Sequence, residues 1–274
     1  MRFKKINDMK VSMYVITHKK FNVPEIDGYI PIQVGVDGKE NLGYLKDNIG
    51  DNISAKNANY CELTGIYWIW KNDTDSDIIG ISHYRRYFKS GGFWANKQPI
   101  DIAEINNIMK KHDIVVAKKE IYGKSSYAQY CQSSGFAKDL DKVRDIIKNK
   151  YDIKYVESFD EVMRGNLMSQ FNMMITTKKL YNQYCKWLFD ILFELEKEID
   201  LKDYNDYQRR IYGFLAERLL NIWLVANSNL RIKNLAVINT ESTLKEKIRI
   251  RLRRVKNYLR FKMKRKDVNE KSYN

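Results

Sequence analysis

The fold that this sequence predicts is decided by residues 57–88, NANYCELTGIYWIWKNDTDSDIIGISHYRRYF. Within residues 60–70, large apolar side chains recur every three or four positions, which is the spacing of one helix face. Residues 73–77 are polar and rich in aspartate, so they predict a turn. The apolar run at 78–81 is too short for a helix and is typical of a strand buried on both faces. A helix, a turn and a buried strand in this order predict an α/β unit.

Polar and cationic side chains follow this strand directly, in the order His83, Tyr84, Arg85 and Arg86. Ligands of open α/β sheets bind beyond the carboxyl ends of the strands. Two neighbouring guanidinium groups can each fork onto phosphate oxygens, which lysine cannot do in the same geometry. The pattern therefore predicts an anion site. The alternative is that Arg85 and Arg86 are surface residues or pair with structural carboxylates.

The rest of the chain extends the α/β pattern. Strand-like runs lie within 10–21, 29–35, 113–117 and 171–176, and helical patterns lie at 102–111, 140–148, 178–197 and 208–226. Residues 118–136 have little apolar periodicity and are expected to form a mobile loop whose polar side chains face a substrate, or else an ordinary surface loop. In the last helix, Glu217 lies off the apolar face beside Arg218, which is typical of a structural ion pair and also allows a catalytic role.

Composition excludes several classes of protein. A chain of 274 residues with 44% hydrophobic and 13% aromatic residues can bury a substantial core and is not disordered. Three widely spaced cysteines form neither a disulfide framework nor a zinc pattern, which favours a reducing compartment. The sequence shows no secretory signal, no apolar run that could span a bilayer, and no G-x-G-x-x-G or Walker A motif.

Most of the net charge of +15 lies near the end of the sequence, because residues 245–266 contain twelve Lys or Arg and one acid. Apolar residues recur there at helical spacing, so we expect a basic amphipathic helix in 241–274 that lies on an anionic membrane surface. Nucleic acid would attract the same charge, but no nucleic-acid-binding motif accompanies it, and self-association through the apolar stripe is a further alternative. The expected membrane contacts are Arg249, Arg253, Lys256, Arg260 and Lys264.

The chain resembles the bacterial capsular and exopolysaccharide glycosyltransferases grouped as domain of unknown function 4422. The resemblance lies in YVITHKKF (14–21), YIPIQVG (29–35), GDNISAKNANYCELTGIYWIWKN (50–72), DIIGISHYRRYF (77–88) and YGFLAERLLNIWL (212–224). It implies a GT-A-like, Rossmann-type mixed sheet flanked by helices over residues 1–240. It also implies transfer of a sugar from a nucleotide-diphospho-sugar, such as UDP-galactofuranose or another UDP-hexose, to a lipid-linked oligosaccharide. The reaction would belong to capsule, exopolysaccharide or O-antigen synthesis at the inner face of the cell membrane.

Site roles follow from this resemblance together with the chemistry of the side chains. Negative charge builds on the departing diphosphate during glycosyl transfer, and cations stabilise it. The expected catalytic residues are His83, Arg85, Arg86 and Glu217, with Asp206 as a second candidate base. The expected donor contacts are Thr17, His18, Lys19, Asn57, Tyr60, Glu62 and Tyr84, and the expected acceptor contacts are Tyr127, Tyr130 and Gln170.

Most GT-A enzymes hold a divalent cation with an Asp-x-Asp motif, and the run Asp73-Thr74-Asp75-Ser76-Asp77 matches this pattern twice. However, the run precedes the strand and therefore lies at its amino end, away from the predicted cleft. We expect no metal site and no required cofactor, with a bound Mn²⁺ or Mg²⁺ as the alternative. A non-catalytic sugar-nucleotide-binding scaffold of a polysaccharide assembly complex is the alternative function.

Overall fold

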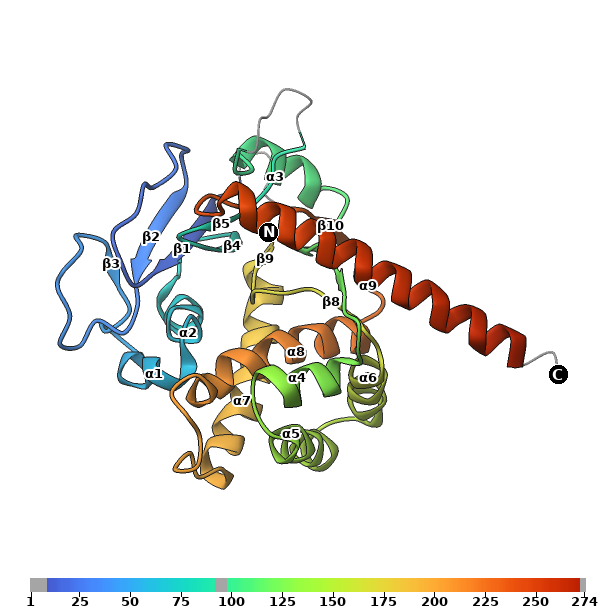
Figure 1. Cartoon of the computed structure of the whole chain (residues 1–274). Helices are drawn as coiled ribbons and strands as arrows, with labels where there is room; N and C mark the ends of the chain where they lie inside the picture. The colour runs from blue at the N-terminus through green and yellow to red at the C-terminus, as the bar shows by residue number, and fades with distance from the viewer. Residues whose placement is uncertain (1–8, 92–97, 272–274) are drawn as a thin grey trace.

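A computed structural model describes residues 9–91 and 98–271, whose centre is a mixed sheet with helices on both faces (Figure 1). The strands are hydrogen-bonded in the order β10-β6-β9-β4-β1-β2-β3, with β5 beside β4 and β11 beside β5. Their bounds are β1 Val11–Thr17, β2 Tyr29–Gln33, β3 Leu45–Lys46, β4 Ile78–His83, β5 Arg86–Phe88, β6 Ile114–Ala117, β9 Met174–Thr177, β10 Ile232–Leu235 and β11 Val237–Asn239.

The helices are distributed along the whole chain, and a separate two-stranded ribbon joins β7 Glu120–Ile121 to β8 Leu167–Met168. The helices are α1 Asn57–Tyr60, α2 Leu63–Asn72, α3 Ile102–Met109, α4 Ser126–Ser133, α5 Ala137–Lys150, α6 Ile153–Arg164, α7 Lys178–Glu198, α8 Ile211–Ala226 and α9 Leu244–Lys271. No helix in the described part of the chain is long and apolar enough to cross a membrane.

Alternation along β1 divides the core into two layers, because successive side chains of a strand point to opposite faces. Tyr14 and Ile16 belong to the larger cluster, which includes buried side chains of α2, α5, α6, α7 and α8. Met13 and Val15 belong to the smaller cluster, which includes residues of α3 and β5. Both faces of the sheet are therefore covered, which explains the continuous apolar runs of β1 and β4.

Strand direction decides where a site can form. β1, β2 and β4 run parallel to one another, β6 and β10 also run parallel, and β9 is antiparallel to its neighbours β4 and β6. The carboxyl ends of β1, β2, β4, β6 and β10 therefore meet at one edge of the sheet. The chain enters β9 from this same edge.

The expected fold class is confirmed: the sheet is mixed, helices flank it, and a C-terminal helix follows it. Three local expectations were wrong or incomplete. The segment expected as a loop at 118–136 contains β7 and α4, and Ser125 caps α4 by accepting the Ala128 backbone N–H. The helix expected from residue 60 is interrupted at Cys61, whose φ is 51°. Helix α6 was not anticipated.

Candidate active site

A cavity of about 920 Å³ opens at the edge where the parallel strands end. Its walls come from the ends of β1 and β4, from α1, from the segment between β8 and β9, and from α4, α8 and α9. The residues expected at a ligand site that line this cavity are Thr17, His18, Asn57, Glu62, His83, Tyr84, Arg85, Arg86, Gln170 and Glu217. The topology thus brings together segments from the beginning, the middle and the end of the described chain.

Arg85 and Arg86 lie at a tight turn between β4 and β5, where His83 pairs with Arg86 across the antiparallel ladder. The Arg86 guanidinium lies 4.6 Å from the centre of the Phe171 ring, and the Arg85 guanidinium lies 5.3 Å from the centre of the Tyr84 ring. A guanidinium over an aromatic face keeps its N–H edge available for another acceptor. Both arginines line the cavity, at the exit of the buried strand β4.

Cations outnumber carboxylates among the described residues that line the cavity. Burial is the main reason that the pKa of His18 is lowered, and the nearby charges of Lys39 and Arg85 lower it further. Burial also lowers the pKa of Arg86, followed by repulsion from Arg85. The contributions of the neighbouring cations, although smaller than that of burial, indicate a positive local potential, which favours an anionic ligand. The six cations are Lys39, Arg85, Arg86, Arg210, Arg218 and Arg253, and the two carboxylates are Glu62 and Glu217.

The two carboxylates hold an unusual turn between β8 and β9. Phe171 and Asn172 have φ values of 79° and 47°, in the left-handed region that non-glycine residues rarely adopt. Glu217 accepts the Phe171 backbone N–H at 3.0 Å through Oε1, and the Asn172 side-chain amide donates to Glu62 at 2.8 Å. The same amide donates to the Gly213 carbonyl oxygen at 3.1 Å. This turn therefore keeps its shape through contacts with α8 and with the α1–α2 junction.

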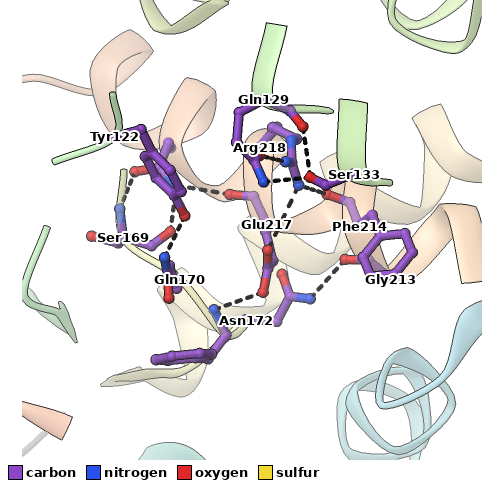
Figure 2. A network of polar contacts seen from close by, with 12 residues as sticks. Tyr122, Gln129, Ser133, Ser169, Gln170, Asn172, Gly213, Phe214, Glu217 and Arg218 are labelled. Atoms are coloured by element: carbon purple, nitrogen blue, oxygen red, sulfur yellow. Dashed lines mark hydrogen bonds and ion pairs between the residues drawn. The ribbon is translucent and has the colours of Figure 1, made fainter. Parts of the chain in front are cut away.

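Glu217 lies in a polar network between Arg218 and the segment from Gln170 to Asn172 (Figure 2). Its Oε2 lies 3.6 Å from the Arg218 guanidinium. Burial raises the pKa of the Glu217 carboxyl, the Arg218 charge opposes this shift, and Glu62 adds to it. Arg218 also donates to Gln129 from α4 and to the Phe214 carbonyl oxygen. A carboxyl with a raised pKa in a cavity is suited to accept a proton.

His83 is held neutral by its surroundings. Burial lowers the pKa of its imidazole, and this effect exceeds the opposing influence of Glu62. Its buried Nε2 atom has no hydrogen-bond partner among the described residues, and the same holds for Nε of Arg85 and Nε of Arg218. All three residues line the cavity. A bound polar ligand would satisfy these groups, since buried polar atoms are normally hydrogen-bonded.

The residues present do not fit the cation site that a GT-A-like fold implies. Asp73 accepts hydrogen bonds from the Tyr14 hydroxyl and from Ser76, and Asp75 pairs with Lys10 at 3.3 Å. These aspartates belong to the turn before β4, at the opposite end of that strand from the cavity. Within residues 9–91 and 98–271, no three His, Cys, Asp or Glu side chains are placed to hold a metal ion.

The comparisons with known proteins agree with this geometry. The family model described as "Domain of unknown function (DUF4422)" matches residues 12–228, which is most of the chain. The chain belongs to the DUF4422 family. No curated protein matches the sequence. Among solved structures, the apo structure of the WbbM bifunctional glycosyltransferase is similar, with a TM-score of 0.76 and 28% sequence identity. The match covers 85% of this chain and 46% of that chain, so this protein spans about half the length of WbbM.

In this DUF4422 chain, two expected ligand contacts are instead core residues. Tyr60 is fully buried, stacks on Tyr212 at 4.3 Å between ring centres, and donates to Glu196 at 3.2 Å. Tyr130 is also fully buried, and its hydroxyl donates to Asp139 at 2.7 Å. A tyrosine that supplies a buried hydroxyl to a structural carboxylate has the same local sequence as one that faces a ligand. The expected ligand roles of these two residues are therefore corrected.

Three other expected residues do not line the cavity. The Tyr127 hydroxyl donates to Asp141 at 3.2 Å. Asp206 is exposed in the turn before α8. Lys19 forms an ion pair of 2.9 Å with Glu241 and lies 4.8 Å from the centre of the Tyr84 ring, beside the cavity.

The expected membrane contacts fall into three groups. Arg249, Lys256 and Arg260 lie on the exposed surface of α9. Arg253 lines the cavity, which the sequence did not indicate. The side chain of Lys264 lies outside the described part of the chain.

Several lining residues of this DUF4422 chain were not among the expected catalytic or ligand-contacting residues. Tyr122 and Gln129 stood in the segment expected to face a substrate, and Arg218 stood beside Glu217, so a signal existed for each. Lys39 and Arg210 carried no signal, because each is a single cation in a polar stretch. Only the tertiary fold places them at the cavity.

Proposed function

We propose that this protein is a glycosyltransferase that uses a nucleotide-diphospho-sugar donor, with UDP-galactofuranose or another UDP-hexose as the first candidates. The observation that carries the proposal is the cavity at the carboxyl edge of the sheet, where six cationic side chains surround two carboxylates. Family membership and the similarity to a glycosyltransferase over 85% of the chain support the same class of reaction. A cavity of about 920 Å³ is large enough for a sugar nucleotide.

In this proposal Arg85 and Arg86 bind the donor diphosphate. The bond between the sugar C1 and the diphosphate oxygen breaks, and the nucleoside diphosphate leaves with the bonding electron pair. Guanidinium groups that are already in place stabilise this growing charge without the cost of reorganising water. His83, neutral and with an unpaired Nε2, contacts the donor in the same place. No divalent cation is required in this proposal, because the two arginines stabilise the negative charge of the diphosphate that a cation would otherwise stabilise.

Glu217 is the proposed base for the acceptor hydroxyl. An inverting transfer forms a bond between the acceptor oxygen and C1 while a carboxylate takes the hydroxyl proton. Glu217 lines the cavity, and burial raises the pKa of its carboxyl, whereas Asp206, the other candidate, is exposed outside the cavity. Tyr122 and Gln170 line the wall near Glu217, and their side chains are hydrogen-bonded to each other (Figure 2).

The proposed acceptor is a lipid-linked oligosaccharide of capsule, exopolysaccharide or O-antigen synthesis, and the proposed location is the inner face of the cell membrane. Helix α9 supports this part of the proposal. Its exposed apolar residues include Leu252 at 65% exposure and Leu259 at 53%, and Lys and Arg fill most of the remaining positions. Such a helix binds anionic lipid surfaces through both its apolar face and its charge.

A panel of sugar nucleotides tests the proposal by thermal shift, followed by a transfer assay with the donor that binds. A ligand that binds only the native state raises the apparent melting temperature. We expect one donor to stabilise wild-type protein and Arg231→Lys, which alters an exposed arginine paired with Asp113 outside the cavity. We expect much less stabilisation of Arg86→Gln.

Two results would contradict the proposal. If no sugar nucleotide stabilises the wild-type protein, the cavity does not bind a donor. If a donor binds but neither transfer nor donor hydrolysis is detected with any glycan acceptor, the protein is a sugar-nucleotide-binding scaffold.

A further inference from the structure

Helix α9 is attached to the body of the protein through the ribbon of β7 and β8. Arg254 makes two hydrogen bonds to the Glu120 carboxylate, of which the one from Nε to Oε2 measures 2.9 Å. One turn further along, the Asn257 side-chain amide donates to the Ile121 carbonyl oxygen at 2.9 Å. Gly123 leaves room for this contact, because a Cβ added there would lie 3.1 Å from Oδ1 of Asn257. These contacts hold one face of α9 against the ribbon.

Arg253 belongs to this same face of the helix. Each residue turns an α-helix by about 100°, so Arg253 lies about 40° from Asn257 around the axis, and Arg254 lies about 60° from Asn257 on its other side. The exposed apolar residues of α9 from Leu244 to Leu259 are centred about 140° away from Arg253. The face that carries Arg253 is therefore separate from the apolar face that is directed away from the body.

Arg253 lines the cavity next to a wall that the docking contacts also hold. Ile121, which accepts the hydrogen bond from Asn257, directly precedes Tyr122 in the cavity wall. Arg254 is paired with Glu120, whereas none of the carboxylates that the structure describes forms an ion pair with Arg253. A cation that faces a cavity without a counter-ion favours an anionic ligand there.

We infer that the docked helix α9 is a wall of the active site and that Arg253 binds the phosphates of the donor. This inference rests on the proposed function, because it adds a binding residue to the same cavity. Arg85 and Arg86 belong to the β4–β5 turn, so Arg253 contacts the ligand from a second wall. Guanidinium groups bind phosphate oxygens in a bidentate geometry.

Two neighbours of Arg253 are positioning residues in this inference. Arg253 reaches the cavity only while its face of α9 stays on the ribbon, and Arg254 and Asn257 make the contacts that keep it there. All three residues lie beyond residue 228, where the match to the family model ends. The binding site would thus extend into a segment that the family model does not cover.

The affinity for UDP, measured by isothermal titration, tests the role of Arg253. We expect Arg253→Gln to weaken UDP binding about fivefold or more, because a charge-assisted contact with phosphate is lost. The matched control is Arg251→Gln, which removes the same charge from an exposed position that does not line the cavity. Arg251 lies about 160° around the helix from Arg253, and we expect its substitution to change UDP affinity less than about twofold.

Reversing the charge of Glu120 tests the docking of α9 separately. Glu120→Lys would repel Arg254 and release the helix, so we expect it to weaken UDP binding. General electrostatic attraction predicts the opposite sign, because the substitution adds a positive charge near an anion site. The double variant Glu120→Lys with Arg254→Glu restores an ion pair of reversed polarity, and we expect its UDP affinity to return to within about twofold of the wild type.

Three outcomes would overturn the inference. Equal UDP affinity in Arg253→Gln and the wild type would exclude Arg253 from the binding site. Tighter UDP binding by Glu120→Lys would show that docking is not needed. A loss in Glu120→Lys that the charge swap does not reverse would assign Glu120 a role other than docking. Failure of the proposed function is a separate result, because the wild-type protein would then bind neither UDP nor any sugar nucleotide.

Discussion

Arg86 combines three properties that a lysine at the same position would lose in part. Its guanidinium lies over the Phe171 ring, it lines the cavity, and it follows the turn that ends β4. We predict that Arg86→Lys lowers turnover at least tenfold, which corresponds to about 1.4 kcal/mol of transition-state stabilisation. Lysine keeps the charge but neither the fork nor the flat face. Steady-state kinetics with Arg231→Lys as the control measures this change, and wild-type turnover in Arg86→Lys would exclude Arg86 from the mechanism.

The proposed role of Glu217 as base predicts how activity depends on pH. The pKa of its carboxyl is raised by burial, so the base becomes protonated at a higher pH than an ordinary glutamate would. We predict that kcat/KM falls on the acidic side of the profile with an apparent pKa above the usual 4.5 for glutamate. Glu217→Gln keeps an oxygen that can accept the Phe171 N–H, so the turn is retained while the base is lost. We expect this variant to lose about 10²- to 10⁴-fold in kcat and to lose the acidic limb.

An unchanged rate in Glu217→Gln would contradict the role of Glu217 as base. Melting temperature is the control, because a large drop would show that the substitution unfolds the turn instead. At the residue scale, the sequence could identify Glu217 but could not choose between an ion pair with Arg218 and a base. The structure contains both features, since Glu217 lies 3.6 Å from Arg218 and also lines the cavity.

The elements themselves were largely predictable where the apolar period is strong. The pattern of 57–88 predicted α2 and β4, and it predicted that the site begins where β4 ends. Helix α4 was missed because its apolar residues are few and its N-cap, Ser125, has the composition of a loop. The break at Cys61 was missed because a positive φ at a residue other than glycine leaves no mark in the sequence. Tyr60 and Tyr130 were misplaced because burial of an aromatic residue depends on elements far away in the chain.

Glu241, in the segment between β11 and α9, is expected to weaken binding of the donor. Glu241 forms ion pairs with Lys19 at 2.9 Å and with Arg85 at 3.7 Å. Its carboxylate would therefore compete with the donor diphosphate for the Arg85 guanidinium. We predict that Glu241→Gln binds the donor about two- to fivefold more tightly at low salt, a modest gain because exposed ion pairs are weak. Isothermal titration measures it. Glu198→Gln, which alters an ion pair with Lys142 away from the cavity, should have no effect, and equal affinities in all three proteins would contradict the prediction.

The position of the aspartates in the turn between α2 and β4 predicts that turnover does not depend on a divalent cation. Because Asp73 and Asp75 are engaged at the amino end of β4, we predict that extensive dialysis against a chelator leaves turnover unchanged. Asp75→Asn, which removes a charge from an exposed side chain, should also retain wild-type turnover. Activity that is abolished by the chelator and restored by Mn²⁺ would contradict the arginine mechanism.

At the scale of the whole molecule, α9 extends across the sheet edge and away from the body (Figure 1). We predict that replacing both Leu252 and Val255 by glutamate lowers partitioning into phosphatidylglycerol vesicles more than tenfold, because each buried methylene contributes about 0.8 kcal/mol. Raising the salt concentration should weaken the binding of the wild-type protein to these vesicles, since the charges of α9 are exposed to solvent. Vesicle sedimentation measures both effects. Ile153→Glu, which alters an exposed isoleucine on α6, is the control and should partition like the wild type.

The positions of the last two strands, β10 and β11, determine where the chain can be truncated without exposing strand edges. β10 pairs with β6 and β11 pairs with β5, yet both strands follow residue 228, where the match to the family model ends. A fragment that ends at residue 228 would lack both strands, so β5 and β6 would each have an edge whose backbone N–H and C=O groups have lost their partners. Bare strands of this kind add to one another between copies, so such a fragment would aggregate rather than report the properties of the intact protein.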